Sequence, residues 1–109
     1  MAERRYPRFP KNLLVNISRN GFDGLGLVMN VSRRGVYVES VQVFPPDTRL
    51  SLLLAAGNSL IPLSGTVVWR KESDGEFSQG ASGGMGIQIA SAPGEYIRYL
   101  REVCDEGNG

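Results

Sequence analysis

Apolar and β-prone residues are concentrated in six short stretches of the chain, and the last part of the chain changes to a helical period. Leu13, Val15 and Ile17 show the period-2 pattern of a strand with one buried face. Further apolar or β-prone stretches, separated by clusters of turn-forming residues, predict the other strands. These predicted strands cover residues 25–31, 36–39, 50–55, 63–70 and 85–89. Beyond residue 93 the apolar side chains fall on one arc of a helical wheel, which predicts a C-terminal helix with one buried face.

Short strands separated by frequent turns indicate a small antiparallel β-barrel or β-sandwich. Closure into a barrel would remove the exposed edges of so few strands. The 14 glycines and 6 prolines agree with frequent chain reversal, and 109 residues suffice for one domain but not for two. We therefore expect one all-β domain over residues 12–106, with the helix as its last element.

The first eleven residues differ from this domain. Pro7 and Pro10 disfavour helical angles in the residues before them, so we expect residues 1–11 to form an extended, flexible arm. Charge is also unevenly distributed. Residues 1–35 carry seven basic and two acidic groups, a net charge of 7 − 2 = +5, whereas residues 36–109 carry five and nine, a net charge of 5 − 9 = −4. The first third of the chain should therefore attract anions.

Composition excludes several classes of function. The chain has no histidine and one cysteine, Cys104, which rules out a disulfide, a His/Cys zinc site and a Ser-His or Cys-His nucleophile. We therefore expect neither an enzyme nor a metal site. No apolar run approaches the ~20 residues that cross a bilayer, and no signal peptide is evident. Together with the lone thiol, which fits a reducing compartment, this predicts a cytoplasmic protein without membrane insertion.

Two groups of residues could carry binding chemistry, and the first is the pair Arg4 and Arg8 in the arm. Four residues apart in an extended chain they share a face and lie roughly 13 Å apart, so they could straddle a flat ligand of nucleotide size. Guanidinium groups bind phosphate in a fork and also bind the O6/N7 edge of guanine. The alternative for this basic segment is a solvated tail.

The second group is the sequence Asn30-Val31-Ser32-Arg33-Arg34-Gly35 at the end of a predicted strand. Asn30 and Ser32 carry short side chains that can hydrogen-bond to the edge of a base. Gly35 permits a positive φ or a close approach of the backbone to a ligand. The alternative is an ordinary Asx- or Ser-type turn that only ends the strand.

Taken together, the two groups resemble the PilZ domain family, bacterial receptors for cyclic di-GMP. The resemblance continues in Gly65-Thr66-Val67-Val68-Trp69 and Gly84-Met85-Gly86-Ile87, and it covers essentially the whole chain. It implies a six-stranded antiparallel β-barrel with an arginine-bearing arm, and cyclic di-GMP as ligand. The residues it assigns to ligand binding are Arg4, Arg8, Asn30, Ser32 and Gly35. Arg5 and Arg33 lie outside the fixed positions of the family, but their neighbours make them candidates for additional phosphate contacts.

Three other residues are best interpreted as structural. Trp69 and Met85 could be a pair that stacks on a ligand, but both lie on stretches with high β propensity and are more consistent with core positions. Cys104 lies on the apolar arc of the predicted helix and is best interpreted as a small buried hydrophobic residue.

The expected function is that of a ligand-responsive receptor or adaptor. Cyclic di-GMP would neutralise Arg4 and Arg8 and order the arm over the barrel, which would change the surface offered to a partner protein. One alternative is a small β-barrel that binds nucleic acid through its basic arm; the acidic body and the lack of evident exposed aromatic residues argue against a nucleic acid polymer. Another is a PilZ module that contacts proteins without any ligand.

Overall fold

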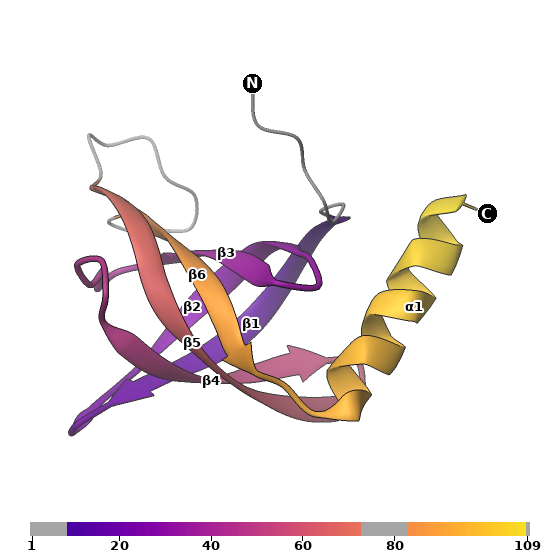
Figure 1. Cartoon of the computed structure of the whole chain (residues 1–109), viewed down its shortest axis with the longest axis horizontal. Coiled ribbons are helices and arrows are strands. Elements are labelled where there is room, and N and C mark those ends of the chain that lie inside the picture. Colours follow the sequence, from indigo (N-terminus) through magenta and orange to yellow (C-terminus); the bar gives the residue numbers. More distant parts are fainter. Residues whose placement is uncertain (1–8, 73–82, 109) are drawn as a thin grey trace.

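The computed structural model describes the backbone of residues 9–72 and 83–108, and the side chains of residues 11–72 and 83–103. Within these residues, six antiparallel strands close into a barrel in the order β1-β2-β3-β6-β5-β4, and one helix follows (Figure 1). The expected all-β barrel is thereby confirmed. The elements are β1 (Phe9–Arg19), β2 (Phe22–Val31), β3 (Gly35–Ser40), β4 (Arg49–Ala56), β5 (Ser59–Glu72), β6 (Gly83–Ser91) and α1 (Gly94–Asn108).

Strand β1 begins four residues before the predicted start at Leu13. Phe9 pairs with Val31 and Pro10 with Asn30, and the register shifts between Pro10 and Leu13. Proline has no backbone N–H to donate. It is tolerated here because the irregular register leaves some backbone positions without a hydrogen bond to the neighbouring strand. Residues 9–11, which we expected in the arm, therefore belong to the barrel wall, whereas residues 1–8 lie outside the described part of the chain.

The turn between β1 and β2 is also tighter than predicted. Asn20 and Gly21 both have positive φ, 40° and 89°. This is the conformation of the two-residue hairpin turns whose twist matches that of the flanking strands. The strands therefore extend through residues 18–19 and 22–24, which lie between the first two predicted strands.

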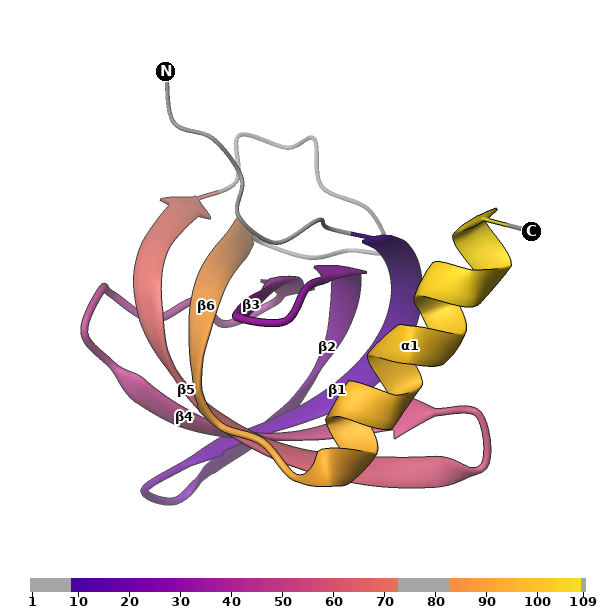
Figure 2. The same cartoon turned by 45° about the vertical axis from the view of Figure 1, so that its right-hand side comes forward.

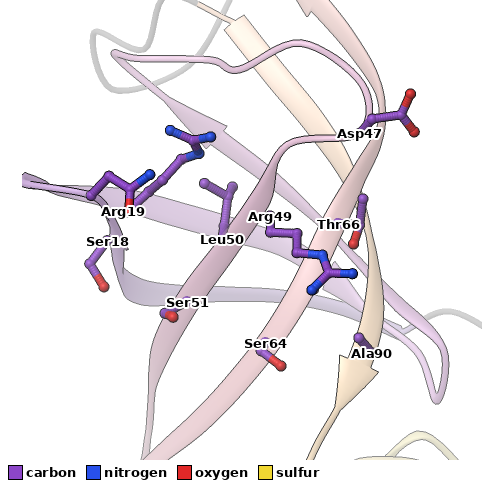
Figure 3. Close-up of a pocket in the computed structure, with 11 residues that line it drawn as sticks. Ser18, Arg19, Asp47, Arg49, Leu50, Ser51, Ser64, Thr66 and Ala90 are labelled. Carbon is purple, nitrogen blue, oxygen red and sulfur yellow. The ribbon is translucent and has the colours of Figure 1, made fainter.

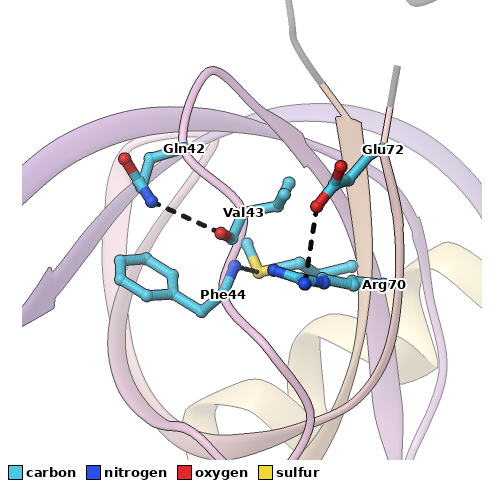
Figure 4. A network of polar contacts seen from close by, with 6 residues as sticks. Gln42, Val43, Phe44, Arg70 and Glu72 are labelled. Carbon is cyan, nitrogen blue, oxygen red and sulfur yellow. Dashed lines mark hydrogen bonds and ion pairs between the residues drawn. The ribbon is translucent and has the colours of Figure 1, made fainter. Parts of the chain in front are cut away.

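Inward-facing side chains at alternating positions of all six strands fill the barrel. Near the β1–β2 turn the core is completed by Phe22 and Phe44, whose rings meet edge to face with centroids 5.3 Å apart. The backbone N–H of Phe44 also donates a hydrogen bond to the buried sulfur of Met85 (3.3 Å), which ties the β3–β4 connection to β6; Figure 4 shows it beside the Arg70–Glu72 ion pair. Met85 is fully buried, so its predicted core position is confirmed.

Helix α1 completes the core beside the opposite end of strand β2. It buries Tyr96, Leu100 and Val103, and it lies alongside β1 in both views (Figures 1 and 2). This amphipathic packing agrees with the predicted helical period. The side chain of Cys104 lies outside the described residues, so its assignment stays a prediction. In residues 9–72 and 83–108 no helix is long and apolar enough to cross a membrane.

Candidate ligand-binding site

The connection between β2 and β3 is a tight turn closed by Ser32 and Gly35. The Ser32 N–H donates to the carbonyl of Gly35 (2.9 Å). The Ser32 hydroxyl donates to the same carbonyl (3.0 Å) and accepts from the N–H of Gly35 (3.1 Å). Ser32 is buried, with 4% of its surface exposed. Its hydroxyl therefore holds the turn together, as in the structural alternative named above.

Gly35 has no positive φ, and its role lies in a close approach to β6. A Cβ at this position would lie 2.9 Å from the carbonyl oxygen of Ile87. On the same side of the barrel the carbonyl of Arg34 accepts a hydrogen bond from the N–H of Ile89 (2.7 Å). The turn is thus bound to β6 and presents the exposed residues Arg33 and Arg34 at a fixed place.

Helix α1 is linked to this turn by one buried hydrogen bond. The hydroxyl of Tyr96 donates to the carbonyl of Ser32 over 2.7 Å, and Tyr96 has no exposed surface. Burial raises the pKa of Tyr96 well above its ordinary value, with a further contribution from Tyr99. The tyrosine therefore stays neutral and joins the turn to the helix.

The predicted site residues are brought together only in part. Asn30, Ser32, Arg33 and Gly35 lie in or beside the β2–β3 turn. Asn30 is half-buried and pairs with Pro10 of β1, so the described chain begins beside the motif. Residues 1–8, with Arg4, Arg5 and Arg8, lie outside the described residues, and their contribution to the site stays a prediction.

A row of aromatic side chains continues outward from Asn30 across the barrel wall. Asn30 pairs with Tyr37 on β3, Tyr37 with Gly86 on β6, and Gly86 with Trp69 on β5. The rings of Tyr37 and Trp69 stack with centroids 5.4 Å apart and an angle of 20° between their planes. Trp69 is 45% exposed, so its predicted core position is wrong. We call Asn30, together with the two aromatic residues Tyr37 and Trp69 that continue from it across the sheet, the aromatic row.

Glycines on β6 make room for this row. A Cβ at Gly86 would collide with the indole nitrogen of Trp69, and a Cβ at Gly84 would collide with the hydroxyl of Tyr37. The two rings can therefore lie flat on the backbone of β6 instead of standing away from it. The glycine pattern that supports the family resemblance thus has a direct structural purpose beside the motif.

A carboxylate completes the surroundings of Tyr37. The Tyr37 hydroxyl donates a long hydrogen bond of 3.4 Å to Glu39, and burial together with the charge of Glu39 raises the pKa of Tyr37. The second carboxylate oxygen of Glu39 is buried and has no hydrogen-bond partner in the part of the chain that the structure describes. Neither residue was predicted from the sequence as part of a site. The alternating pattern of β3 could have shown that Tyr37 and Glu39 lie on the outer face, because they alternate with the buried Val36 and Val38.

Comparison with known proteins agrees with this geometry. The model of the PilZ domain family matches residues 2–106. The Bacillus subtilis inhibitor of motility MotI/DgrA has a similar fold, with a TM-score of 0.79 at 17% sequence identity. The match covers 98% of this chain but only 52% of MotI, so the chain spans about half the length of that protein.

A second solved structure, described as the PilZ domain with c-di-GMP of YcgR from Escherichia coli, gives a TM-score of 0.71 at 12% identity. That match covers 95% of this chain and 91% of the other. No curated protein matches the sequence. Because the family model covers almost the whole chain, from the segment before β1 to helix α1, the chain belongs to the PilZ domain family.

Proposed function

We propose that this protein is a receptor for cyclic di-GMP. The observation that carries the proposal is the position of the aromatic row, which starts at the motif residue Asn30 and lies beside the Ser32–Gly35 turn. Membership of the PilZ family supports the choice of ligand, as does the solved PilZ domain of YcgR, which is described with c-di-GMP. Cyclic di-GMP offers two flat bases and two phosphates, and each finds a matching group here.

The bases suit the aromatic row. A guanine can stack on the exposed indole of Trp69, an interaction typically worth about 1–3 kcal/mol per base. The amide of Asn30 offers both a donor and an acceptor for the edge of a base. Three strand spacings separate Asn30 from Trp69, roughly 14 Å, which leaves room for a ligand with two bases.

The phosphates suit the arginines. Arg33 is exposed on the turn, and we propose that it acts together with Arg4, Arg5 and Arg8 through forked, charge-assisted hydrogen bonds. Ser32 has a different role in this proposal, because its hydroxyl is buried and already bound to Gly35. Ser32 and Gly35 would shape the turn that positions Arg33, instead of contacting the ligand through their side chains.

The consequence of binding would be a changed surface for a partner protein in the cytoplasm, without catalysis. Residues 1–8 would close over the bound ligand, as the family resemblance implies. The turn is also joined to helix α1 through Tyr96 and the carbonyl of Ser32, so a ligand-induced shift of the turn would reach the helix directly. A ligand drives such a change only through different affinities for the two states.

The single tryptophan of the chain makes the test direct. Trp69 lies in the proposed site, so addition of cyclic di-GMP should change its fluorescence, and titration calorimetry should give the affinity. We expect Trp69→Ala to weaken binding by roughly tenfold to a hundredfold, because one stacked base is lost. Asn30→Ala and Arg8→Ala should each weaken it about tenfold.

Arg101→Ala is the matched control, because Arg101 is exposed on α1 and outside the aromatic row. It should bind like the parent protein, and cyclic di-AMP should bind far more weakly than cyclic di-GMP. Unchanged fluorescence and no heat on addition of cyclic di-GMP would overturn the proposal and favour a PilZ module that acts without ligand. Equal losses in Arg8→Ala and Arg101→Ala would show that only general charge attraction is at work.

A second candidate function is the binding of single-stranded nucleic acid. It is favoured by the 45% exposure of Trp69, because the sequence analysis had argued against a polymer from the apparent lack of exposed aromatic residues. Stacking on exposed aromatic side chains is a common mode of single-strand binding. An oligonucleotide that binds more tightly than cyclic di-GMP, with affinity falling steeply as salt rises, would support this second candidate instead.

A further inference from the structure

The outer face of the barrel carries a second polar concavity, which is formed mainly by β1, β4 and the part of β5 before Trp69. Ser18 of β1 pairs with Ser51 of β4, and Ser51 pairs with Ser64 of β5. Each serine adjoins buried residues along its strand, so all three hydroxyls face outward. We call these three residues the serine row. They line a pocket of about 680 Å³, within the usual size of small-molecule sites.

Two arginines and a threonine extend the pocket beyond the serine row. Arg49 lies two residues before Ser51 on β4 and pairs with Thr66 of β5, and Arg19 follows Ser18. In Figure 3 the guanidinium of Arg49 extends across β5 between Thr66 and Ala90. The carboxylate of Asp47 lies at the margin of the pocket and points away from the serines (Figure 3). The outer face of the pocket therefore combines the cation Arg49 with hydroxyl groups, whereas Arg19 pairs with the core-packed Phe22 and lies on the other face of β1.

The polar side chains of this pocket are not used by the rest of the described protein. Arg19 and Arg49 form no ion pair with any residue of the described segments, and the hydroxyls of the serine row and Thr66 form no hydrogen bond with them. This differs from Ser32 and Ser40, which are buried and whose hydroxyls are bound to backbone groups. The pocket thus offers charged donors and hydroxyls that a ligand can bind without breaking contacts within the fold.

We propose that this pocket binds a small phosphorylated sugar. The phosphate would bind the guanidinium of Arg49, since guanidinium groups bind phosphate through paired, charge-assisted hydrogen bonds. The sugar would lie along the serine row, which spans about 10 Å over two strand spacings and offers hydroxyls as both donors and acceptors. A purely apolar ligand would leave these groups unpaired, and a simple anion would use only Arg49.

The pocket is a neighbour of the proposed cyclic di-GMP site but distinct from it. Gly35 pairs with Gln88, Gln88 with Thr66, and Thr66 with Arg49, so three strand spacings, about 14 Å, separate the motif turn from Arg49. Within the aromatic row, Trp69 lies three positions after Thr66 on β5, roughly 10 Å along the strand. The two ligands should therefore bind at the same time, and the proposal does not depend on cyclic di-GMP binding.

Amide chemical shifts of the full chain, followed by NMR during titration with glucose 6-phosphate and with ribose 5-phosphate, test the proposal. At least one of the two should shift the signals of Ser18, Ser51, Ser64 and Thr66, with a Kd on the order of 1 mM or lower. Inorganic phosphate alone and glucose alone should each bind about tenfold more weakly, because each uses half of the pocket. Addition of cyclic di-GMP should leave this binding unchanged.

Matched variants separate the pocket from general charge effects. Arg49→Ala should weaken binding of the sugar phosphate about tenfold or more, and Ser64→Ala roughly fivefold. Arg101→Ala should have no effect, because Arg101 is exposed on helix α1 and does not line the pocket.

Three results would overturn the proposal. The first is that neither sugar phosphate shifts these four residues. The second is that inorganic phosphate binds as well as the sugar phosphates do, which would reduce the pocket to a general anion site. The third is that cyclic di-GMP displaces the sugar phosphate, which would make the pocket part of the dinucleotide site.

Discussion

The Ser32–Gly35 turn and the serine row show two uses of the same side chain on one barrel. Ser32 is buried, and its hydroxyl makes two hydrogen bonds with Gly35. Ser51 is exposed, and its hydroxyl has no partner in the described residues. One serine stabilises the fold and the other is available to a ligand. The comparison teaches that a motif serine can serve a binding site by building its support, without touching the ligand.

A substitution of Gly35 should have the largest effect on stability, and it tests the structural role of the Ser32–Gly35 turn. Gly35→Val should destabilise the protein by about 3 kcal/mol, because the new side chain meets the carbonyl of Ile87, a backbone group that cannot move aside easily. Urea unfolding of the two proteins measures this difference. Gly94→Val is the control, since a Cβ there would meet only the end of the Arg98 side chain, at 3.9 Å. Equal stability of Gly35→Val and the parent protein would contradict the close packing of the turn on β6.

The two serines themselves give the next largest effect. Ser32→Ala should lower the free energy of unfolding by about 2 kcal/mol, because the buried N–H of Gly35 loses its acceptor. Ser51→Ala should change it by less than about 0.5 kcal/mol, because Ser51 is exposed and makes no contact that folding requires. Urea unfolding again measures both. Similar values for the two variants would remove the distinction between a structural and an available serine.

The fold was largely predictable because burial imposes a period on each strand. All six strands and the helix were found, but their bounds were too narrow. Trp69 shows where alternation fails. Counting in twos from the buried Leu63 and Val67 would bury Trp69, but the register of β5 against β6 shifts between Val67 and Trp69. One extra residue moves every following side chain to the other face, and a run of β-branched residues does not show where that residue is inserted.

The site was less predictable than the fold because its parts are defined by contacts between distant strands. The motif residues Asn30, Ser32 and Gly35 could be found from their spacing. The role of Ser32 could not, because a turn serine and a ligand-binding serine look alike until the partner of the hydroxyl is known. Tyr37 and Trp69 are 32 positions apart in the sequence and meet only because β3 and β5 flank β6.

The link between the turn and helix α1 gives a smaller effect at neutral pH than Gly35→Val or Ser32→Ala, but the most specific one. Tyr96→Phe keeps the ring in the core but leaves the buried carbonyl of Ser32 without its donor, so it should cost about 1 kcal/mol. The pKa of Tyr96 is raised in the folded protein, so unfolded chains lose this proton first as pH rises. The stabilising contribution of Tyr96 is therefore complete below the ordinary tyrosine pKa, about 10, and is lost progressively above it.

Urea unfolding of the parent and Tyr96→Phe proteins at about pH 7 and about pH 11 measures this directly, on either side of the ordinary tyrosine pKa. At the lower pH the parent protein should be more stable than Tyr96→Phe. This difference in the free energy of unfolding should shrink or change sign at the higher pH. Tyr37→Phe is the control, because the pKa of Tyr37 is raised in the same direction but its ring is only partly buried. Its difference from the parent should change less with pH. A constant difference for Tyr96→Phe across this range would mean that the hydroxyl is accessible to water, and then the turn and the helix are not joined through a buried hydrogen bond.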